Sequence, residues 1–144
     1  MRVVIVGAGY VGLVSGCCFA EFGAEVTCVD VDEARINALK QHHIPIFEPA
    51  LKELLTTNAD AGRLNFTTDL PSAVPSADLV FIAVGTPSRR GDGHADLTYV
   101  LEAAYEVGKH LSGYTVIVDK STVPVGTARQ VKRVIEEVNP DADF

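Results

Sequence analysis

The residues best suited to chemistry in this chain form a glycine-rich turn near its start. Gly7-Ala8-Gly9-Tyr10-Val11-Gly12 directly follows a β-branched run, Arg2–Val6, and opens a stretch with helical character. In such a turn Gly7 permits the tight bend, Gly9 lets the backbone approach a ligand, and Gly12 lets helix and sheet pack closely. Free N–H groups and the positive end of the helix dipole would then face the ligand, which favours a diphosphate.

A carboxylate lies where such a site needs a second binding group. Asp30 ends the next apolar run, 18 positions after Gly12. A carboxylate there can accept both ribose hydroxyls of an adenosine and repels a 2′-phosphate, so the two features together predict a dinucleotide site that favours NAD over NADP. Arg35, in the helix that follows, is either a solvated helix residue or a nearby group that could also receive a phosphate.

Two polar loops are predicted at the same edge of the fold. Val84-Gly85-Thr86-Pro87 follows the fourth apolar run, and residues 120–126, which include Ser121 and Thr122, follow the fifth. Ligands of open α/β sheets bind outside the carboxyl ends of the strands, so both loops are candidates for lining the cofactor cleft. Gly85 would give access to the backbone and Thr86 would offer a hydroxyl. Each loop taken alone could equally be an ordinary connection.

Short apolar runs alternate with helix-like stretches along the chain, which predicts an α/β fold of the Rossmann type with a doubly wound parallel sheet. The predicted strands are Arg2–Val6, Glu25–Asp30, Leu64–Thr67, Leu79–Val84 and Thr115–Val118. The predicted helices are Tyr10–Phe22, Asp32–Gln41, Ala50–Ala61, Leu97–Leu111 and Thr127–Val138, with a short helix capped by Asp69. Because six residues follow the last helix, we expect one domain over 1–144 whose sheet lacks its last strand.

Composition excludes several classes of function. The chain has 144 residues, 47% of them hydrophobic, and a net charge of −7, so it can build a core and would not be attracted to nucleic acid or to an anionic membrane. No run approaches the ~20 apolar residues of a membrane span. Three cysteines, two of them adjacent, make a poor disulfide framework and indicate a cytoplasmic setting. The four histidines lack metal-ligand spacing, so no metal is predicted. We interpret the histidines and the cysteines as structural residues: Cys17, Cys18, Cys28, His42, His43, His94 and His110.

Taken together, these residues resemble the UDP-glucose and GDP-mannose dehydrogenases, the nucleotide-sugar 6-dehydrogenase family. The similar blocks are GAGYVGLV at 7–14, VDVD at 29–32 with Arg35-Ile36, PIFEPALKELL at 45–55, FIAVGTPS at 81–88, GDGHADLTYV at 91–100 and DKSTVPVGT at 119–127. Within the family the similarity is greatest to bacterial UDP-glucose 6-dehydrogenases, and it covers their N-terminal NAD-binding domain. One departure is Ala50, where the family pattern usually has Gly.

The resemblance implies a role for particular residues. The amides around Tyr10 and Val11 would meet the pyrophosphate, and Asp30 and Arg35 the adenosine ribose. Gly85, Thr86 and Ser121 would lie beside the cofactor, the latter two at its nicotinamide half. Thr122 would help to position a water beside the reacting C6 of the sugar. Apart from the resemblance, the 89–94 loop is interpreted as a mobile exposed loop, or as one whose two arginines approach an acidic sugar nucleotide.

The resemblance also implies what the longer enzyme does. It would oxidise UDP-glucose to UDP-glucuronate with two NAD, through a cysteine in a downstream Gly-Gly-Ser-Cys segment, and would form a homodimer through a central helix. Neither that segment nor the sugar-binding domain lies within 1–144, so we expect this chain alone to bind NAD without turnover. The alternatives are the same domain of a GDP-mannose or UDP-N-acetylmannosamine dehydrogenase, or a non-enzymatic NAD-binding module.

Overall fold

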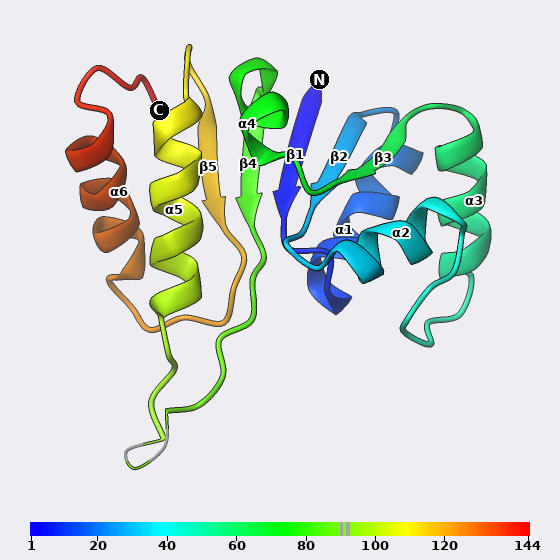
Figure 1. Ribbon diagram of the computed structural model, residues 1–144, viewed down its shortest axis with the longest axis horizontal. Coiled ribbons are helices and arrows are strands. Elements are labelled where there is room, and N and C mark those ends of the chain that lie inside the picture. Colours follow the sequence, from blue (N-terminus) through cyan, green and yellow to red (C-terminus); the bar gives the residue numbers. More distant parts are fainter. Residues whose placement is uncertain (90, 92) are drawn as a thin grey trace.

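The computed structural model describes residues 1–89, 91 and 93–144, and these build a parallel sheet of five strands with helices on both faces (Figure 1). The sheet order is β3-β2-β1-β4-β5. The chain builds β2 and β3 on one side of β1 and then returns to build β4 and β5 on the other, so the strand order reverses between β1 and β4. The predicted α/β Rossmann-type fold is confirmed. The strands are β1 (Arg2–Val6), β2 (Glu25–Val29), β3 (Leu64–Thr67), β4 (Leu79–Ile82) and β5 (Val116–Asp119).

The central strand is buried on both faces, which explains its continuous β-branched run. Val3 and Ile5 belong to one hydrophobic core, whereas Val4 between them belongs to the other. Side chains alternate across a strand, so a strand between two layers of helices needs apolar residues at every position. β1 pairs in parallel with β2 (Ile5 beside Cys28) and with β4 (Ile5 beside Phe81).

Each face of the sheet is covered by its own helices. The first core joins Leu13 of α1 to Leu39 of α2 and Leu55 of α3, and the second joins Val100 of α5 to Ile135 of α6. These five side chains are all inaccessible to solvent, and truncating one to Ala typically costs about 2–5 kcal/mol. The helices are α1 (Tyr10–Glu21), α2 (Glu33–Lys40), α3 (Leu51–Asp60), α4 (Leu70–Ala73), the 3₁₀ turn η1 (Val74–Ser76), α5 (Thr98–His110) and α6 (Thr127–Val138).

Several element ends differ from the predicted ones. β4 ends at Ile82, two residues early. β5 begins one residue late because the backbone N–H of Thr115 donates to Asp143, outside the sheet. α5 begins at Thr98, and its N-cap position is Leu97 rather than Asp96, although the Asp96 carboxylate still accepts the Thr98 N–H at 3.0 Å. Asp69 caps α4 as predicted, accepting the backbone N–H of Ser72.

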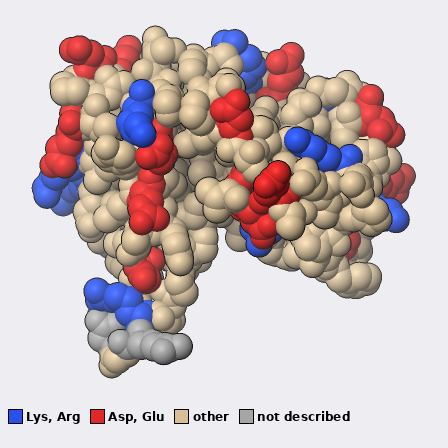
Figure 2. Space-filling view, in the orientation of Figure 1, with Lys and Arg blue, Asp and Glu red and all other residues tan. Residues whose placement is uncertain are grey.

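Charge is distributed over this scaffold without a basic stripe on the face drawn in Figure 2, where acidic side chains run along α5 and the blue groups are scattered. None of the described helices is long and apolar enough to cross a membrane.

Candidate dinucleotide-binding site

The three glycines of the turn occupy different surroundings, as the sequence predicts. Gly7 has a φ of +106°, and a Cβ there would lie 2.5 Å from the carbonyl oxygen of Ala83, so both the turn and its approach to β4 require glycine. A Cβ on Gly12 would lie 1.9 Å from the Gly7 oxygen. A Cβ on Gly9 would meet nothing within 4 Å. Gly7 and Gly12 therefore serve packing, while Gly9 borders open space.

That open space lies at the start of α1. Gly9 is the N-cap residue and has no side chain, so it makes no side-chain cap, and the first turn of α1 carries no acidic residue. The first N–H groups of a helix have no partner within it, and together with the helix dipole they attract an anion. Tyr10 and Val11 begin this helix and are both exposed. The arrangement suits a phosphate group.

Asp30 connects this turn to the end of β2. Its carboxylate is almost entirely buried, with a side-chain exposure of 8%. Oδ2 accepts the backbone N–H of Ala8 at 2.8 Å and the guanidinium of Arg35 at 2.8 Å, and Oδ1 accepts the backbone N–H of Asp32 at 2.9 Å. An ionised carboxylate offers about four acceptor positions, so the remaining one is on Oδ1. The predicted ribose-binding residue thus also fixes the glycine turn, a second role that sequence reasoning missed.

Arg35 is ion-paired, which excludes the interpretation as a merely solvated helix residue. Nη1 lies 2.8 Å from Asp30 Oδ2 and Nη2 lies 3.6 Å from Asp32 Oδ2, with about a third of the side chain exposed. The pairing follows from the N-cap of α2, where Asp32 accepts the Arg35 backbone N–H at 3.0 Å and fixes the first turn. Asp30 and Arg35 together form one polar corner beside the turn.

The two polar loops meet at the same edge of the sheet, because β4 lies between β1 and β5. The Ser121 hydroxyl lies 3.0 Å from the Val84 oxygen and 3.3 Å from the Ile82 oxygen, and the Lys120 N–H donates to Ile82. Ser121 therefore ties the loop after β5 to the loop after β4. A seryl hydroxyl donates one hydrogen bond, so its lone pairs remain available to accept others.

The other predicted residues of these loops are exposed or half-buried. Gly85 is exposed and borders space that a Cβ would enter without contact, while Thr86 is half-buried and Thr122 is exposed. Of the two arginines in the 89–94 loop, Arg89 is exposed; Arg90 lies outside the described residues, as does Asp92 of the same loop.

Two of the three cysteines lie in the core and stay protonated at neutral pH. Cys17 and Cys28 are buried, whereas Cys18 is half-buried. Burial raises the pKa of Cys17 to about 12 and raises the pKa of Cys28 well above its ordinary value. A thiol that stays protonated is a poor nucleophile. In the part of the chain that the structure describes, no group of three or more His, Cys, Asp or Glu side chains could hold a metal ion.

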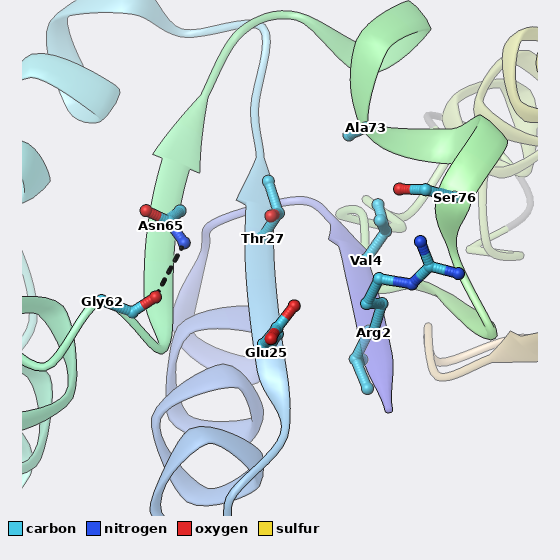
Figure 3. Close-up of a pocket in the computed structure, with 9 residues that line it drawn as sticks. Arg2, Val4, Glu25, Thr27, Gly62, Asn65, Ala73 and Ser76 are labelled. Atoms are coloured by element: carbon cyan, nitrogen blue, oxygen red, sulfur yellow. Dashed lines mark hydrogen bonds between the residues drawn. The ribbon is translucent and has the colours of Figure 1, made fainter.

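A pocket of about 150 Å³ lies at the opposite end of the strands (Figure 3). Its lining includes Arg2 at the start of β1, Glu25 at the start of β2, and Thr27 and Asn65 on the sheet face. None of the predicted site residues lines it. Strand starts are not where doubly wound sheets bind ligands, so this pocket is distinct from the candidate cleft.

The fold and this edge define a dinucleotide-binding domain: a reversal of strand order, a glycine turn opening a helix, and a carboxylate at the end of β2. The family model for the UDP-glucose/GDP-mannose dehydrogenase family, NAD binding domain, matches residues 1–144. The chain belongs to this family, and its cofactor is NAD.

Relatives and solved structures agree with this assignment. The chain is 63% identical to a UDP-glucose 6-dehydrogenase of Rhizobium meliloti (strain 1021) over 99% of its own length and 33% of the relative's. It is 51% identical to the UDP-glucose 6-dehydrogenase TuaD of Bacillus subtilis (strain 168), over 96% of this chain and 30% of that protein. A crystal structure of GDP-mannose dehydrogenase from Pseudomonas aeruginosa superposes with a TM-score of 0.93 at 39% identity, covering 99% of this chain and 33% of that one. The chain therefore spans about a third of the length of these relatives.

Proposed function

We propose that this chain is the cofactor domain of a UDP-glucose 6-dehydrogenase, an enzyme that oxidises UDP-glucose to UDP-glucuronate with two NAD. The observation that carries the proposal is the combination of the Asp30-anchored glycine turn with 63% identity to a UDP-glucose 6-dehydrogenase. The sugar nucleotide would be held mainly by the part of the longer protein outside these 144 residues.

The described residues fit NAD. Gly9 leaves room beside the uncapped start of α1, where the N–H groups of Tyr10 and Val11 would hold the pyrophosphate. Asp30 has an acceptor position left on Oδ1 for a ribose hydroxyl, and Arg35 lies against the same carboxylate. NAD, when bound, supplies the acceptor for a hydride from the sugar.

The loops after β4 and β5 would position the reacting end. Gly85 leaves room for the cofactor, while Thr86 and Ser121 would hydrogen-bond the nicotinamide half, and the link from Ser121 to Val84 would keep the two loops in register. Thr122, exposed on the next position, would hold a water beside C6. Cys17 and Cys28 are unsuited to act as nucleophile because burial keeps their thiols protonated.

Two measurements test this proposal. Calorimetric titration of the 144-residue chain with NAD should give saturable binding, and addition of UDP-glucose should give no NADH. The longer protein that carries this domain should form two NADH for each UDP-glucose. NADH formation by the 144-residue chain at a rate near that of the longer protein would contradict the proposal, since it would require a nucleophile within residues 1–144.

A GDP-mannose dehydrogenase is the second candidate. The GDP-mannose dehydrogenase of Pseudomonas aeruginosa shares the fold with a TM-score of 0.93 at 39% identity, and a UDP-glucose dehydrogenase of Pyrobaculum islandicum shares it with the same TM-score, so the fold does not separate the two. Comparing NADH formation from UDP-glucose, GDP-mannose and UDP-N-acetylmannosamine by the longer protein separates the candidates, and we expect UDP-glucose to be used at least about tenfold more efficiently.

We also propose that the enzyme is a cytoplasmic homodimer. Three free cysteines, two of them buried with raised thiol pKa values, suit a reducing compartment. The dimer follows from the family resemblance. Sedimentation of the longer protein would test it, and a monomer at micromolar concentration would contradict it.

A further inference from the structure

A hydrogen bond joins the first residue of α1 to a segment that lies outside the dinucleotide site described above. The Tyr10 hydroxyl donates to Glu48 Oε2, across 38 positions of sequence, at 2.5 Å. Glu48 lies in residues 42–50, which connect α2 to α3 and which we term the strap. Tyr10 directly follows Gly9, so the backbone that carries this side chain lies beside the place where the diphosphate would bind.

The strap is built to present Glu48 to α1. Along residues 43–49 exposure alternates: Ile44, Ile46 and Glu48 are half-buried, while the residues between them are exposed. Ile44 and Ile46 pack against the core that contains Leu13 of α1. Ile44, Ile46 and Glu48 thus share the less exposed side of the strap, and the two isoleucines fix the strap against the core onto which α1 packs. Phe47, between them, is 94% exposed.

The contact has the chemistry of a stable donor–acceptor pair. The phenol is protonated at neutral pH, and Glu48, through this hydrogen bond and its negative charge, raises the pKa of Tyr10 further above its ordinary value of 10.0. A hydrogen bond to a carboxylate is stronger than one between neutral groups. The Tyr10 side chain is thereby held toward the strap, at the start of the helix whose N–H groups face the ligand.

We propose that Glu48 is a positioning residue for the cofactor: through Tyr10 it fixes the first turn of α1 and makes the strap part of the diphosphate site. The inference rests on diphosphate binding at the glycine turn. Because coupling between two sites is reciprocal, a strap contact that favours the diphosphate must in turn be stabilised by it.

Ligand fragments separate this role from a general effect on stability. ADP-ribose reaches the first turn of α1, whereas adenosine reaches the Asp30 corner alone. We expect Tyr10→Phe and Glu48→Ala each to weaken ADP-ribose binding about three- to tenfold, with adenosine binding unchanged. Glu48→Gln keeps an acceptor and should stay within about twofold of the parent chain. The double variant should lose no more than either single one.

Tyr114→Phe serves as the matched control, because Tyr114 is also exposed but precedes β5 at the far end of the strands. Titrations by calorimetry and NMR, with thermal unfolding of every variant, give the result. The inference would be overturned if the variants lost as much affinity for adenosine as for ADP-ribose, or if Tyr10→Phe bound ADP-ribose as tightly as the parent chain. It would also be overturned if the losses of affinity added in the double variant, or if Glu48→Gln bound ADP-ribose as weakly as Glu48→Ala. If the parent chain bound NAD and the variants bound ADP-ribose as tightly as the parent, this inference would be wrong and the proposed NAD site would be unaffected. If the parent chain did not bind ADP-ribose, both this inference and the proposed NAD site would be wrong.

Proteolysis gives a second readout that does not depend on affinity. Phe47 is an exposed chymotrypsin site within the strap. Reciprocal coupling requires saturating NAD to slow cleavage after Phe47 in the parent chain, and Tyr10→Phe should reduce that protection at equal saturation. Equal protection in both chains would overturn the coupling.

Discussion

The Asp30 carboxylate accepts the backbone N–H of Ala8 at 2.8 Å, so the group predicted to bind ribose also holds the turn predicted to bind diphosphate. The two halves of the cofactor site are connected by one buried side chain. A change at Asp30 therefore acts on the fold and on the site together.

Replacing Asp30 by Ala should weaken NAD binding and lower stability. The substitution leaves the buried N–H group of Ala8 and the partly buried N–H group of Asp32 without their acceptor and removes the ribose contact. We expect a loss of about 1–3 kcal/mol in NAD binding, measured by calorimetry, and a comparable loss in the free energy of unfolding. Unchanged NAD affinity would show that the ribose does not use this carboxylate.

Asp30→Asn should change cofactor selectivity. It keeps the shape and one acceptor oxygen but removes the charge that repels a 2′-phosphate, and it leaves Asp32, at 3.6 Å, as the ionic partner of the Arg35 guanidinium. We expect the ratio of NAD to NADP affinity to fall by about tenfold or more. Adding Arg35→Ala should abolish the increase in NADP affinity, because the Arg35 cation would bind the 2′-phosphate. An equal increase in the double variant would show that Arg35 does not contribute to NADP binding.

The glycines allow packing and ligand access to be separated. Gly9 has φ −77° and ψ −166°, which any residue can adopt, and a Cβ there meets nothing in the protein. Gly9→Ala should therefore unfold at the parent temperature yet bind NAD at least about tenfold more weakly, since the methyl group enters the ligand's space. Gly12→Ala, whose Cβ would overlap the Gly7 oxygen, should instead cost more than about 2 kcal/mol in unfolding free energy. Titration combined with thermal unfolding checks both, and a destabilised Gly9→Ala would contradict this division.

Local signals in the sequence predicted most of the fold and much of the site. The β-branched run of β1, the glycine turn and the 3.6-residue pattern of α6 are each visible within a dozen residues, and the bounds of β1 and α6 match the predicted ones. The contacts of Asp30 with Ala8, of Ser121 with Val84 and of Tyr10 with Glu48 join positions 22 to 38 residues apart. Their partners are set by sheet register and by the path of the strap, which no local pattern encodes.

Ala50 offers a gain in stability. It is the N-cap of α3 and has a φ of +64°, a left-handed conformation in which an L residue is strained. Ala50→Gly should raise the unfolding free energy by about 0.5–1 kcal/mol, as the relief of strain outweighs the greater chain entropy of glycine. Ala61→Gly, at the other end of the same helix with φ −76°, is the control and should lower stability. Denaturant unfolding measures the change in unfolding free energy for both variants. Changes of the same sign would contradict backbone strain at Ala50.

Asp119, at the end of β5, should make stability depend on pH in an unusual direction. Its Oδ2 is buried and has no hydrogen-bond partner among the described residues, while Oδ1 accepts the Ser121 N–H at 3.2 Å. Burial raises the pKa of Asp119 above its ordinary value of 3.8. The folded chain thus binds the proton more tightly than the unfolded one, so this group lowers stability as pH rises from its unfolded pKa through its folded pKa.

Asp119→Asn should remove that loss. The amide keeps an acceptor for the Ser121 N–H and carries no charge to bury, so the variant should be more stable than the parent at pH 7. The advantage should disappear below pH 3.8, where the parent carboxyl is protonated in both states. Denaturant unfolding of both chains across this range measures the difference. A variant that is less stable at neutral pH, or an advantage that persists in acid, would contradict the cost that burial of the ionised Asp119 carboxylate is expected to carry.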